Sequence, residues 1–415
     1  MSPAARADEL ERRYLSDIFA ELCRIESPSG RERACSLRIA EELRALGLEV
    51  EEDDAGAVAG SDCGNLLARV PGGVHAAGGA SAVGGAAQGA LSAPTAARDH
   101  VGSEAEGERA SLLLCAHMDT VPLQAPVEPV LNDGFWENAN EGILGADNKA
   151  AVAVLLTLAR RVRREGAPVD LELLFTVGEE RSLAGARAFD VARLRSPLGY
   201  VFDHSSPVGE VILASPSHHR LRANFRGVAA HAGVRPEEGR SAILAAARAV
   251  ADMRLGRIDA QTTANVGTIA GGSALNVVPE HCSILAEVRG HRDERSEEII
   301  AELLDCVHEA ANLPECECDV DVSVERTFRG YRTSPSAPAV RAAEGALRAC
   351  GYEPVRIWSG GASDANALIA HGLPTVNLAN GTERNHEPGE RVSVQALEAM
   401  LDVALALPAE VAAVS

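Results

Sequence analysis

The sequence predicts an α/β protein in which a doubly wound, mostly parallel sheet forms a catalytic domain and a smaller α+β sandwich is inserted into it. Three observations lead to this fold class. The chain has 415 residues, more than one hydrophobic core comfortably accommodates. From residue 111 to residue 202, short apolar runs alternate with helical patterns, as in parallel sheets. This rhythm changes near residue 213 and resumes after about residue 330.

The N-terminal segment is predicted to form two helices, over residues 10–24 and 32–46, because apolar residues recur there at spacings of three and four. Gly47 is a natural end for the second helix. Short strands are predicted at 48–50 and 65–70. These elements come before the alternating region, and we assign them to the catalytic domain.

Residues 72–109 differ from the rest of the chain in composition. They are mainly Gly, Ala and Ser, with almost no large apolar side chains. Such a segment cannot bury enough surface to offset the entropy that it would lose on ordering. We interpret it as a flexible insertion between two strands of the catalytic domain, with a functional lid as the alternative.

The alternating region is the part of the sequence that predicts the parallel sheet. Its predicted elements, in chain order, are strand 111–116, helix 148–164, strand 170–177 and strand 199–202. The helix ends in a basic run, and positive side chains at a helix C-terminus complement the helix dipole. The run therefore needs no explanation through nucleic acid.

The inserted unit is predicted from a change of rhythm to longer strands with two helices. Its strands are expected at 219–228, 262–269, 281–288 and 319–325, and its helices at 241–253 and 294–311. Catalytic elements then resume as helix 336–349, strand 354–358, helix 363–370, strand 374–378 and helix 393–406. We therefore divide the chain into a catalytic domain, residues 1–212 and 329–415, and an inserted dimerisation or lid domain, residues 213–328.

The composition argues against several classes of partner. The formal net charge is -21, whereas nucleic acids and anionic lipids need a basic surface. No stretch approaches about 18 uninterrupted apolar residues, so no membrane span is expected. Residues 1–13 are polar and charged, unlike a signal peptide. The nine cysteines are scattered and odd in number, which is simplest to interpret as a reduced, cytoplasmic chain.

Imidazoles and carboxylates recur where predicted strands end or helices begin. These residues are His117, Asp147, Glu179, Glu180, Asp203 and His386. In an open α/β sheet the carboxyl ends of the strands form the ligand crevice. Each residue alone has an ordinary explanation, such as a turn Asp or a helix-capping Glu. Their shared context instead predicts a hydrolytic centre with two metal ions.

The ligands divide between the two metal ions. A pair of divalent cations needs one carboxylate that spans both, and Asp147 is our candidate for this bridge. His117 and Asp203 would complete one metal site, and Glu180 and His386 would complete the other. No thiolate belongs to this set, which favours zinc, manganese or cobalt over copper.

Two further carboxylates are candidates for the chemistry itself. A base must take a proton from the attacking water, and Glu179, adjacent to the ligand Glu180, suits this role. Asp119 lies two residues after His117 and could accept the second N–H of its imidazole, which would fix the tautomer. The alternative for Asp119 is a turn-forming residue shortly before Pro122.

Six short motifs together resemble one known family. They lie at residues 117–122, 145–150, 178–180, 231–233, 361–366 and 372–378. As a group they resemble the M20 family of metallopeptidases, in particular its peptidase T-like (tripeptide aminopeptidase-like) branch. The resemblance covers most of the chain except the 72–109 insertion. It implies a two-metal hydrolase with an inserted dimerisation domain, and it supports the metal ligands, the base and Asp119 as assigned above.

The resemblance also implies roles for three residues of the inserted domain. In similar enzymes, the His of the motif at 231–233 reaches across a dimer to stabilise the oxyanion, so His231 takes that role in an expected homodimer. Asn276 and Arg289 become candidates for binding polar groups of the substrate, and Arg suits a carboxylate because it binds bidentately. Considered alone, these residues are a loop His, a turn Asn and a surface ion-pairing Arg.

Several residues depart from the family pattern or are additional candidates for the site. Asn148 stands where many relatives carry an acidic residue, and Arg181 follows the glutamate pair close to the expected metals. His204 follows Asp203 and is an additional candidate ligand or proton carrier. His218 and His219 are neighbours on a strand and therefore point to opposite faces, so we interpret them as structural.

The leading functional interpretation is a two-metal hydrolase that cleaves the peptide bonds of small peptides, as an aminopeptidase or tripeptidase. Glu179 would deprotonate a metal-bridging water. The alternative in the same family is an N-acyl amino-acid deacylase. A metal- or peptide-binding homologue without catalysis is also considered, but the intact Glu179 speaks against it because mere binding needs no base. A phosphoesterase would require a phosphate-binding Gly-rich loop before a helix, which we do not find.

Overall fold

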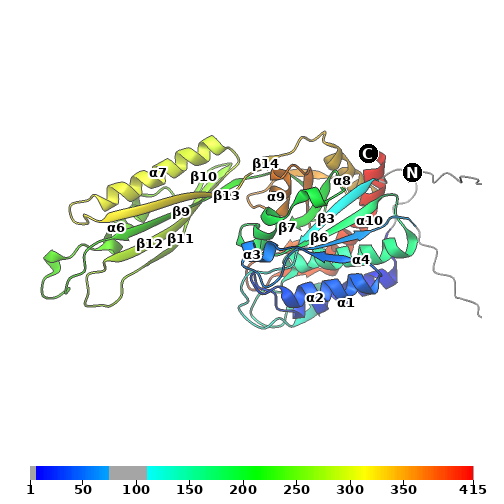
Figure 1. Ribbon diagram of the computed structural model, residues 1–415, viewed down its shortest axis with the longest axis horizontal. Helices are drawn as coiled ribbons and strands as arrows, with labels where there is room; N and C mark the ends of the chain where they lie inside the picture. The colour runs from blue at the N-terminus through cyan, green and yellow to red at the C-terminus, as the bar shows by residue number, and fades with distance from the viewer. Residues whose placement is uncertain (1–5, 74–109, 415) are drawn as a thin grey trace, which may run out of the picture.

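The computed structural model describes residues 6–73 and 110–414 of the chain. Almost all of the predicted 72–109 insertion lies outside the described residues. Two bodies are visible, a large one that holds both described ends of the chain and a small one built around α6, α7 and strands β9–β13 (Figure 1). The prediction of an α/β catalytic domain with an inserted α+β unit is confirmed.

The large body is organised around a nine-stranded sheet. Its strand order is β1-β2-β6-β3-β7-β16-β8-β14, and β15 also pairs with β8. The central pairs β3–β6, β3–β7 and β7–β16 are parallel, whereas β1, β2 and β14 pair antiparallel near the two edges. The strands are β1 Val50–Glu52, β2 Leu66–Val70, β3 Ser111–His117, β6 Asp170–Thr176, β7 Gly199–His204, β8 Glu210–Ser215, β14 Tyr331–Arg332, β15 Val355–Trp358 and β16 Thr375–Ala379.

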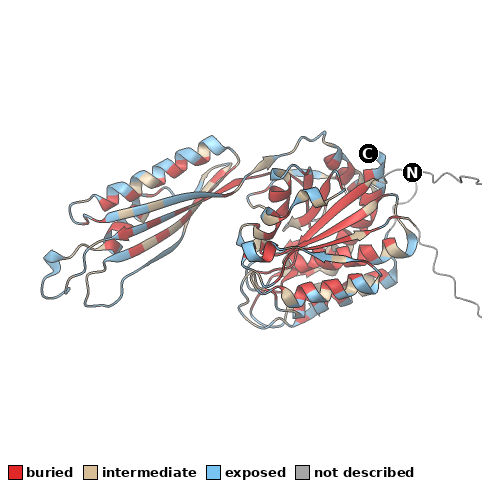
Figure 2. Cartoon of the chain, viewed as in Figure 1, coloured by how far each residue is buried: buried red, intermediate tan, exposed pale blue. Residues whose placement is uncertain are grey.

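Helices cover both faces of the large sheet, because alternate residues of its strands are apolar on each side. In β3, Leu112 and Leu114 join one core cluster and Leu113 and Cys115 join the other. The first face is covered by α1 Glu9–Arg24, α2 Arg33–Ala45, α4 Ala146–Glu165, α8 Pro338–Ala349 and α10 Val394–Val414. The opposite face carries the shorter helices α5 Ala184–Ala188 and α9 Asp364–Ala370. Buried residues accordingly concentrate in the strands between them (Figure 2).

Local sequence signals explain several helix ends. Helix α1 begins with a capping box, in which Asp8 accepts from the Glu11 backbone N–H at 2.8 Å and Glu11 accepts from the Asp8 N–H at 2.9 Å. At the end of α4, Arg161 and Arg164 pair with Glu11 at 2.6 and 2.9 Å. The basic run of α4 is therefore engaged in ion pairs that join it to α1. Helix α10 continues past its predicted end at residue 406 to Val414, and buried Val411 lies in this extension.

The small body is an antiparallel sheet with two helices on one face. The strand order is β10-β11-β12-β9-β13. Along β9, Leu221, Ala223 and Phe225 are buried beneath the helices, whereas the intervening residues face away from them. The elements are β9 Ser217–Arg226, α6 Ala242–Asp252, β10 Gly256–Asp259, β11 Thr262–Gly271, β12 His281–Gly290, α7 Asp293–Ala311 and β13 Asp319–Phe328. The short strand β10 was not predicted.

A third, four-stranded sheet was also not predicted. Its order is β17-β18-β5-β4, with β4 Pro129–Asn132, β5 Phe135–Asn138, β17 Thr382–Glu383 and β18 Arg391–Ser393. Asp133 and Gly134 form the β4–β5 turn and both have positive φ, 47° and 82°. An Asp-Gly pair between short strands is a strong hairpin signal. This sheet joins the region after β3 to the C-terminal part of the chain.

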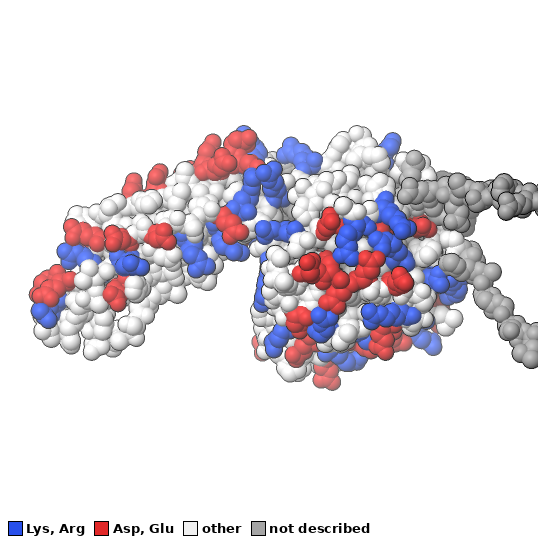
Figure 3. Space-filling model, viewed as in Figure 1, with Lys and Arg blue, Asp and Glu red and all other residues white. Residues whose placement is uncertain are grey.

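Two further features bear on the environment of the protein. All nine cysteines lie within the described ranges, and they are free thiols. Among residues 6–73 and 110–414, no helix has both the length and the apolar character needed to cross a bilayer. On the face seen in Figure 3, basic and acidic side chains are interspersed over both bodies.

Candidate metal centre

The five predicted metal ligands lie at one edge of the large sheet, where its parallel strands end. They occupy the end of β3, the first turn of α4, the 3-10 turn η1 (Glu179–Arg181) after β6, the end of β7 and the loop between β17 and β18. In that order they are His117, Asp147, Glu180, Asp203 and His386. The doubly wound topology thus brings together side chains that are far apart in the sequence.

Asp147 lies at the centre of the cluster. Its Oδ1 is 3.2 Å from Nε2 of His117, and its Oδ2 is 3.2 Å from Nε2 of His386. Nε2 of His117 is also 3.7 Å from Oδ1 of Asp203, and Nε2 of His386 is 2.8 Å from Oε1 of Glu180. Ligand atoms of His117, Asp147 and Glu180 all lie within 4.8 Å of one another. The five side chains therefore form one continuous cluster.

The ring of His117 is oriented by Asp119. Nδ1 of His117 is 2.9 Å from the backbone oxygen of Asp119 and 3.4 Å from its Oδ1. The nearer acceptor is thus the carbonyl rather than the predicted carboxylate. When Nδ1–H donates to this carbonyl, Nε2 has a lone pair that faces Asp147 and Asp203. An acceptor nitrogen opposite a carboxylate oxygen at 3.2 Å requires a proton or a metal cation between them.

The turn that carries Glu179 and Glu180 is anchored by two buried carboxylates. Gly178 has φ +60°, a left-handed conformation that favours glycine. Its N–H donates to Oε1 of Glu32 at 3.1 Å. Asp119 accepts from the N–H of Glu179 at 3.0 Å and from that of Glu180 at 3.2 Å. Asp119 therefore links the end of β3 to the turn after β6.

The loop before α4 is held by residues from the C-terminal part of the chain. Glu390 is buried and accepts three backbone N–H groups, from Leu144 at 2.9 Å and from Gly145 and Asp147 at 2.8 Å. The Nδ2 of Asn385 donates to Oδ2 of Asp147 at 2.9 Å. Neither Glu390 nor Asn385 was predicted. In the sequence, Glu390 looks like an ordinary solvated loop residue. Its closeness to His386, four residues earlier, was the only indication that it belongs to the site.

Charge–charge contacts within the cluster shift the pKa values of its imidazoles. Hydrogen bonds with Asp147 and Glu180 raise the pKa of His386 to about 10. Burial disfavours the charged form of His117, but hydrogen bonds with the surrounding aspartates raise its pKa well above the ordinary value. Burial would raise the pKa of Asp147, yet its bonds to the two imidazoles hold it well below the usual range.

The remaining carboxylates repel one another in a buried site. Burial raises the pKa of Glu179 far above its usual value, and the nearby Asp203 raises it further. Burial also raises the pKa of Glu180, and it raises that of Asp203 to about 7, with Asp147 contributing. The site thus contains more acidic groups than the two imidazoles can balance, and divalent cations would relieve this excess.

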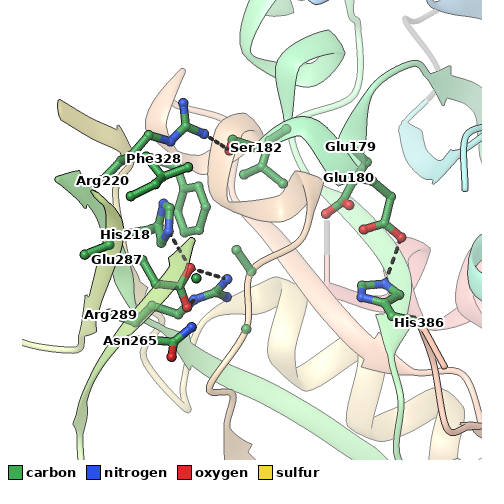
Figure 4. Close-up of a pocket in the computed structure, with 16 residues that line it drawn as sticks. Glu179, Glu180, Ser182, His218, Arg220, Asn265, Glu287, Arg289, Phe328 and His386 are labelled. Carbon is green, nitrogen blue, oxygen red and sulfur yellow. Dashed lines mark hydrogen bonds and ion pairs between the residues drawn. The ribbon is translucent and has the colours of Figure 1, made fainter. Parts of the chain in front are cut away.

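A cavity of about 480 Å³ opens beside the cluster, between the two domains. Glu179, Glu180 and His386 line one side, and Arg289 lies among the small-domain residues on the other side (Figure 4). Ligand atoms of Glu179 also lie within 4.8 Å of those of His117 and Asp203. Glu179 therefore borders both the cluster and the space that a substrate would enter.

Two of the predicted residues lie away from this cavity. His231 follows β9, and Asn276 lies in the loop between β11 and β12; these loops are at the end of the small domain remote from the large one (Figure 1). Both residues are exposed, and the N–H of Ala232 donates to the carbonyl of Asn276 at 3.0 Å. Within one chain, neither residue lines the cavity beside the metal ligands.

The residues that depart from the family pattern have clear positions. His204 directs Nδ1 to Oγ of Ser206 at 2.8 Å, and it is absent from the ligand groups found among the described residues. The guanidinium of Arg181 donates to the carbonyl of Gly60 at 3.4 Å and is exposed. Asn148 is fully buried, and neither of its side-chain polar atoms has a hydrogen-bond partner among the residues that the structure describes.

Imidazoles and carboxylates gathered at the carboxyl edge of an α/β sheet, beside a cavity, are characteristic of a metal-dependent hydrolase. The family described as peptidase family M20/M25/M40 matches residues 113–410, and the chain belongs to this family. The chain is thus a hydrolase of a peptidase family, and the predicted resemblance, including the peptidase T-like branch, is confirmed.

Two solved structures and one curated relative match nearly the whole chain. The aminopeptidase PepT from Bacillus cereus ATCC 10987 is 34% identical, with 97% of this chain and 99% of that chain covered and a TM-score of 0.76. A tripeptidase from Staphylococcus aureus subsp. aureus Mu50 is 30% identical at the same coverage, with a TM-score of 0.81. The uncharacterized protein YqjE of Bacillus subtilis (strain 168) is 32% identical over 97% of this chain and 99% of its own length.

Proposed function

We propose that this protein is a two-metal hydrolase that cleaves peptide bonds of small peptides, as an aminopeptidase or tripeptidase. His117, Asp147, Glu180, Asp203 and His386 would hold the metal ions, with Asp147 between them. One observation carries this proposal: the two oxygens of Asp147 each lie 3.2 Å from the imidazole of a different histidine. A carboxylate that faces two imidazoles in this way is suited to bridge two cations. The named activities of the aminopeptidase and tripeptidase relatives support the choice of substrate.

The donor set favours zinc, with manganese or cobalt as alternatives. All five side chains offer imidazole nitrogen or carboxylate oxygen, and these are ligands that zinc accepts. Nδ1 of His117 is occupied by the Asp119 carbonyl, which leaves Nε2 for a metal ion. When bound, a pair of divalent cations would polarise the substrate carbonyl and lower the pKa of a water molecule held there.

Glu179 would act as the general base and then as the general acid. Its burial and its carboxylate neighbours raise its pKa, so it can take a proton from water and later release it to the leaving amine. Its backbone N–H is fixed by Asp119, which keeps the side chain at the edge of the cavity. Asp119 would therefore orient both the ligand His117 and the base.

The oxyanion would be stabilised by His231 of the partner subunit in a homodimer. The exposure of His231 and its distance from the cavity of its own chain support a role across an interface. Asn276 lies beside it through the Ala232–Asn276 hydrogen bond and would contact the substrate from the same partner. Arg289 already lines the cavity and would bind the substrate carboxylate within its own subunit.

A substrate panel tests the reaction. Purified protein loaded with zinc, manganese or cobalt is assayed with tripeptides, dipeptides and N-acyl amino acids, and release of free amino acids is measured. We expect the highest kcat/KM with a small peptide. Preference for the N-acyl amino acids would establish the deacylase alternative. Metal retention without turnover of any of these substrates would establish a binding protein.

The role of the base is tested by Glu179→Gln. We expect turnover to fall by about 10²–10⁴-fold while the metal content is retained, because general base catalysis contributes about this much. Glu128→Gln changes an exposed glutamate in the same way and serves as the matched control. Unchanged turnover in Glu179→Gln would reject Glu179 as the base.

Mixing inactive variants tests the contribution across the dimer. Glu179→Gln and His231→Ala each carry one defect, and a mixed dimer contains one site that has both native residues if His231 acts in the partner's site. Activity recovered on refolding the two variants together, measured against each variant alone, is the expected result. If His231 acted within its own chain, every site of a mixed dimer would keep one of the defects and no activity would return.

A further inference from the structure

One face of the small-domain sheet forms the wall of the cavity opposite the metal cluster. Side chains two residues apart on a strand point to the same face. On β12, Glu287 and Arg289 lie opposite Arg220 and His218 of β9, and on β11, Asn265 lies opposite Glu287. All five residues line the cavity, facing Glu179, Glu180 and His386 across it (Figure 4). This wall is the face that α6 and α7 leave uncovered.

Glu287 holds the guanidinium of Arg289 from one side. Nε of Arg289 donates to Oε1 and Nη2 donates to Oε2, each at 3.2 Å. This engages one edge of the guanidinium in a bidentate contact. Among the described residues, Nη1 of Arg289 has no hydrogen-bond partner. The other edge of the guanidinium therefore remains free for a ligand in the cavity.

Glu287 is itself held by His218. Nε2 of His218 is 2.9 Å from Oε2 of Glu287, and Nδ1 contacts Oγ1 of Thr327. The His218 ring also stacks on Phe328, with centroids 5.1 Å apart and an interplanar angle of 19°. The hydrogen bond from His218 and the charge of Arg289 lower the pKa of Glu287 to about 2, so its carboxylate stays ionised near neutral pH.

This chain of contacts orders the side chain of Arg289 before a ligand binds. An unsupported Arg side chain samples many rotamers, and ordering it on binding costs affinity. Here Thr327 and Phe328 fix His218, His218 fixes Glu287, and Glu287 fixes Arg289 before any ligand arrives. A planar guanidinium with one free edge can donate to both oxygens of a carboxylate, whereas a neutral amide offers it a single acceptor oxygen and no charge.

We propose that Glu287 and His218 are specificity-determining positioning residues that hold Arg289 for a substrate carboxylate and so restrict this enzyme to substrates with a free α-carboxylate. Peptides capped as C-terminal amides would bind more weakly. This inference rests on the proposed function, since it names the substrate class of the same site. It assigns no catalytic step to either residue, because both act through Arg289.

Binding to a catalytically inactive protein tests the proposal separately from hydrolysis. In the zinc-loaded Glu179→Ala protein, calorimetry compares trialanine with trialanine amide. We expect the free acid to bind at least about 10-fold more tightly, and we expect this preference to disappear when Glu287→Gln is added. His218→Asn should lose a smaller part of the preference, because it removes one support of Glu287.

Glu325→Gln is the matched control for Glu287→Gln. Glu325 lies opposite Arg220 on β13, in the same cross-strand row as Glu287, but it pairs weakly with Arg220 at 4.0 Å and does not touch Arg289. It should leave the acid preference and zinc content unchanged. The proposal is overturned if Glu287→Gln retains zinc and keeps the preference, or if Glu325→Gln loses it equally.

Kinetics of the otherwise native enzyme give a second readout. Glu287→Gln should raise KM for trialanine by about 10-fold with little change in kcat, because the lost contact binds ground state and transition state alike. A fall in kcat with unchanged KM would contradict a positioning role. If the native enzyme cleaves no peptide yet the binding preference follows Glu287, then the proposed reaction fails while this inference stands.

Discussion

The carboxylate of Asp119 accepts three hydrogen bonds that hold the turn beside the candidate metal ligands. Asp119→Asn therefore tests how this support affects both stability and metal binding. Oδ1 of Asp119 accepts from the N–H of Glu179, and its Oδ2 accepts from the N–H of Glu180 and from Oγ of Ser29 at 2.6 Å. Asparagine retains one oxygen. Whichever way its amide is turned, the NH₂ group faces a backbone N–H that donates in the native protein. One charge-assisted bond is lost and one buried donor loses its acceptor.

The size of this effect follows from those contacts. Asp119 is fully buried, so water cannot replace the missing acceptor. We expect the free energy of unfolding to fall by about 2–4 kcal/mol. Because the Asp119 carboxylate also holds the backbone N–H of the candidate ligand Glu180, zinc affinity should fall by about 10–100-fold, as for other residues that support metal ligands. Urea unfolding of metal-free protein and zinc competition with a chelating dye measure the two quantities.

Ser29→Ala is the control for this prediction. It removes a single hydrogen bond to Asp119 and leaves both backbone contacts of the carboxylate in place. Its cost should stay near 1 kcal/mol, about the net value of one hydrogen bond. Native stability and native zinc affinity in Asp119→Asn would refute the reasoning, and so would equal losses in the two variants.

Two further predictions concern the metal centre. The pKa of His386 is raised to about 10, so its ring carries a proton at pH 7 in metal-free protein, and the pKa of His117 is raised as well. Zinc binding should therefore release protons and strengthen as pH rises toward about 10. Calorimetry in two buffers of different ionisation enthalpy measures this release, and a buffer-independent heat would count against it. His204→Ala should change zinc affinity by less than about twofold, because the ring bonds to Ser206 rather than to the cluster. A tenfold loss would instead place His204 among the ligands.

Topology explains why the clustering of the five candidate ligands could be predicted from the sequence. His117 and Asp203 stand at the ends of predicted parallel strands, and parallel strands end on the same edge of a sheet. The supporting residues lacked such a signal. Glu390 is buried and accepts three backbone N–H groups, and the sequence of a loop does not reveal which of its residues are buried. The β4–β5 hairpin was missed although Asp133-Gly134 signals it, because the flanking strands are only four residues long.

The inserted domain shows where strand periodicity alone was insufficient. Alternation placed His218 and His219 on opposite faces, and the structure agrees, since His218 faces the cavity whereas His219 does not line it. The interpretation of His218 and His219 as structural rather than metal-binding followed from this alternation, which gives no information on the partner of either ring. The partner of His218, Glu287, lies 69 residues away, and only the register between β9 and β12 joins them. For His231, the residue pattern alone indicated only a loop His, and its proposed role across a dimer came from the family resemblance.

The contribution of the C-terminal segment to the cluster has a consequence for how the protein is made. During synthesis, His117, Asp147, Glu180 and Asp203 emerge before the inserted domain, but His386, Asn385 and Glu390 emerge after it. A nascent chain can therefore present only an incomplete set of ligands, around a loop that still lacks Glu390 beneath its backbone. Completion of the cluster, and with it tight retention of metal, is deferred until translation of this segment, so ribosome-bound or C-terminally shortened chains should be free of the assembled centre.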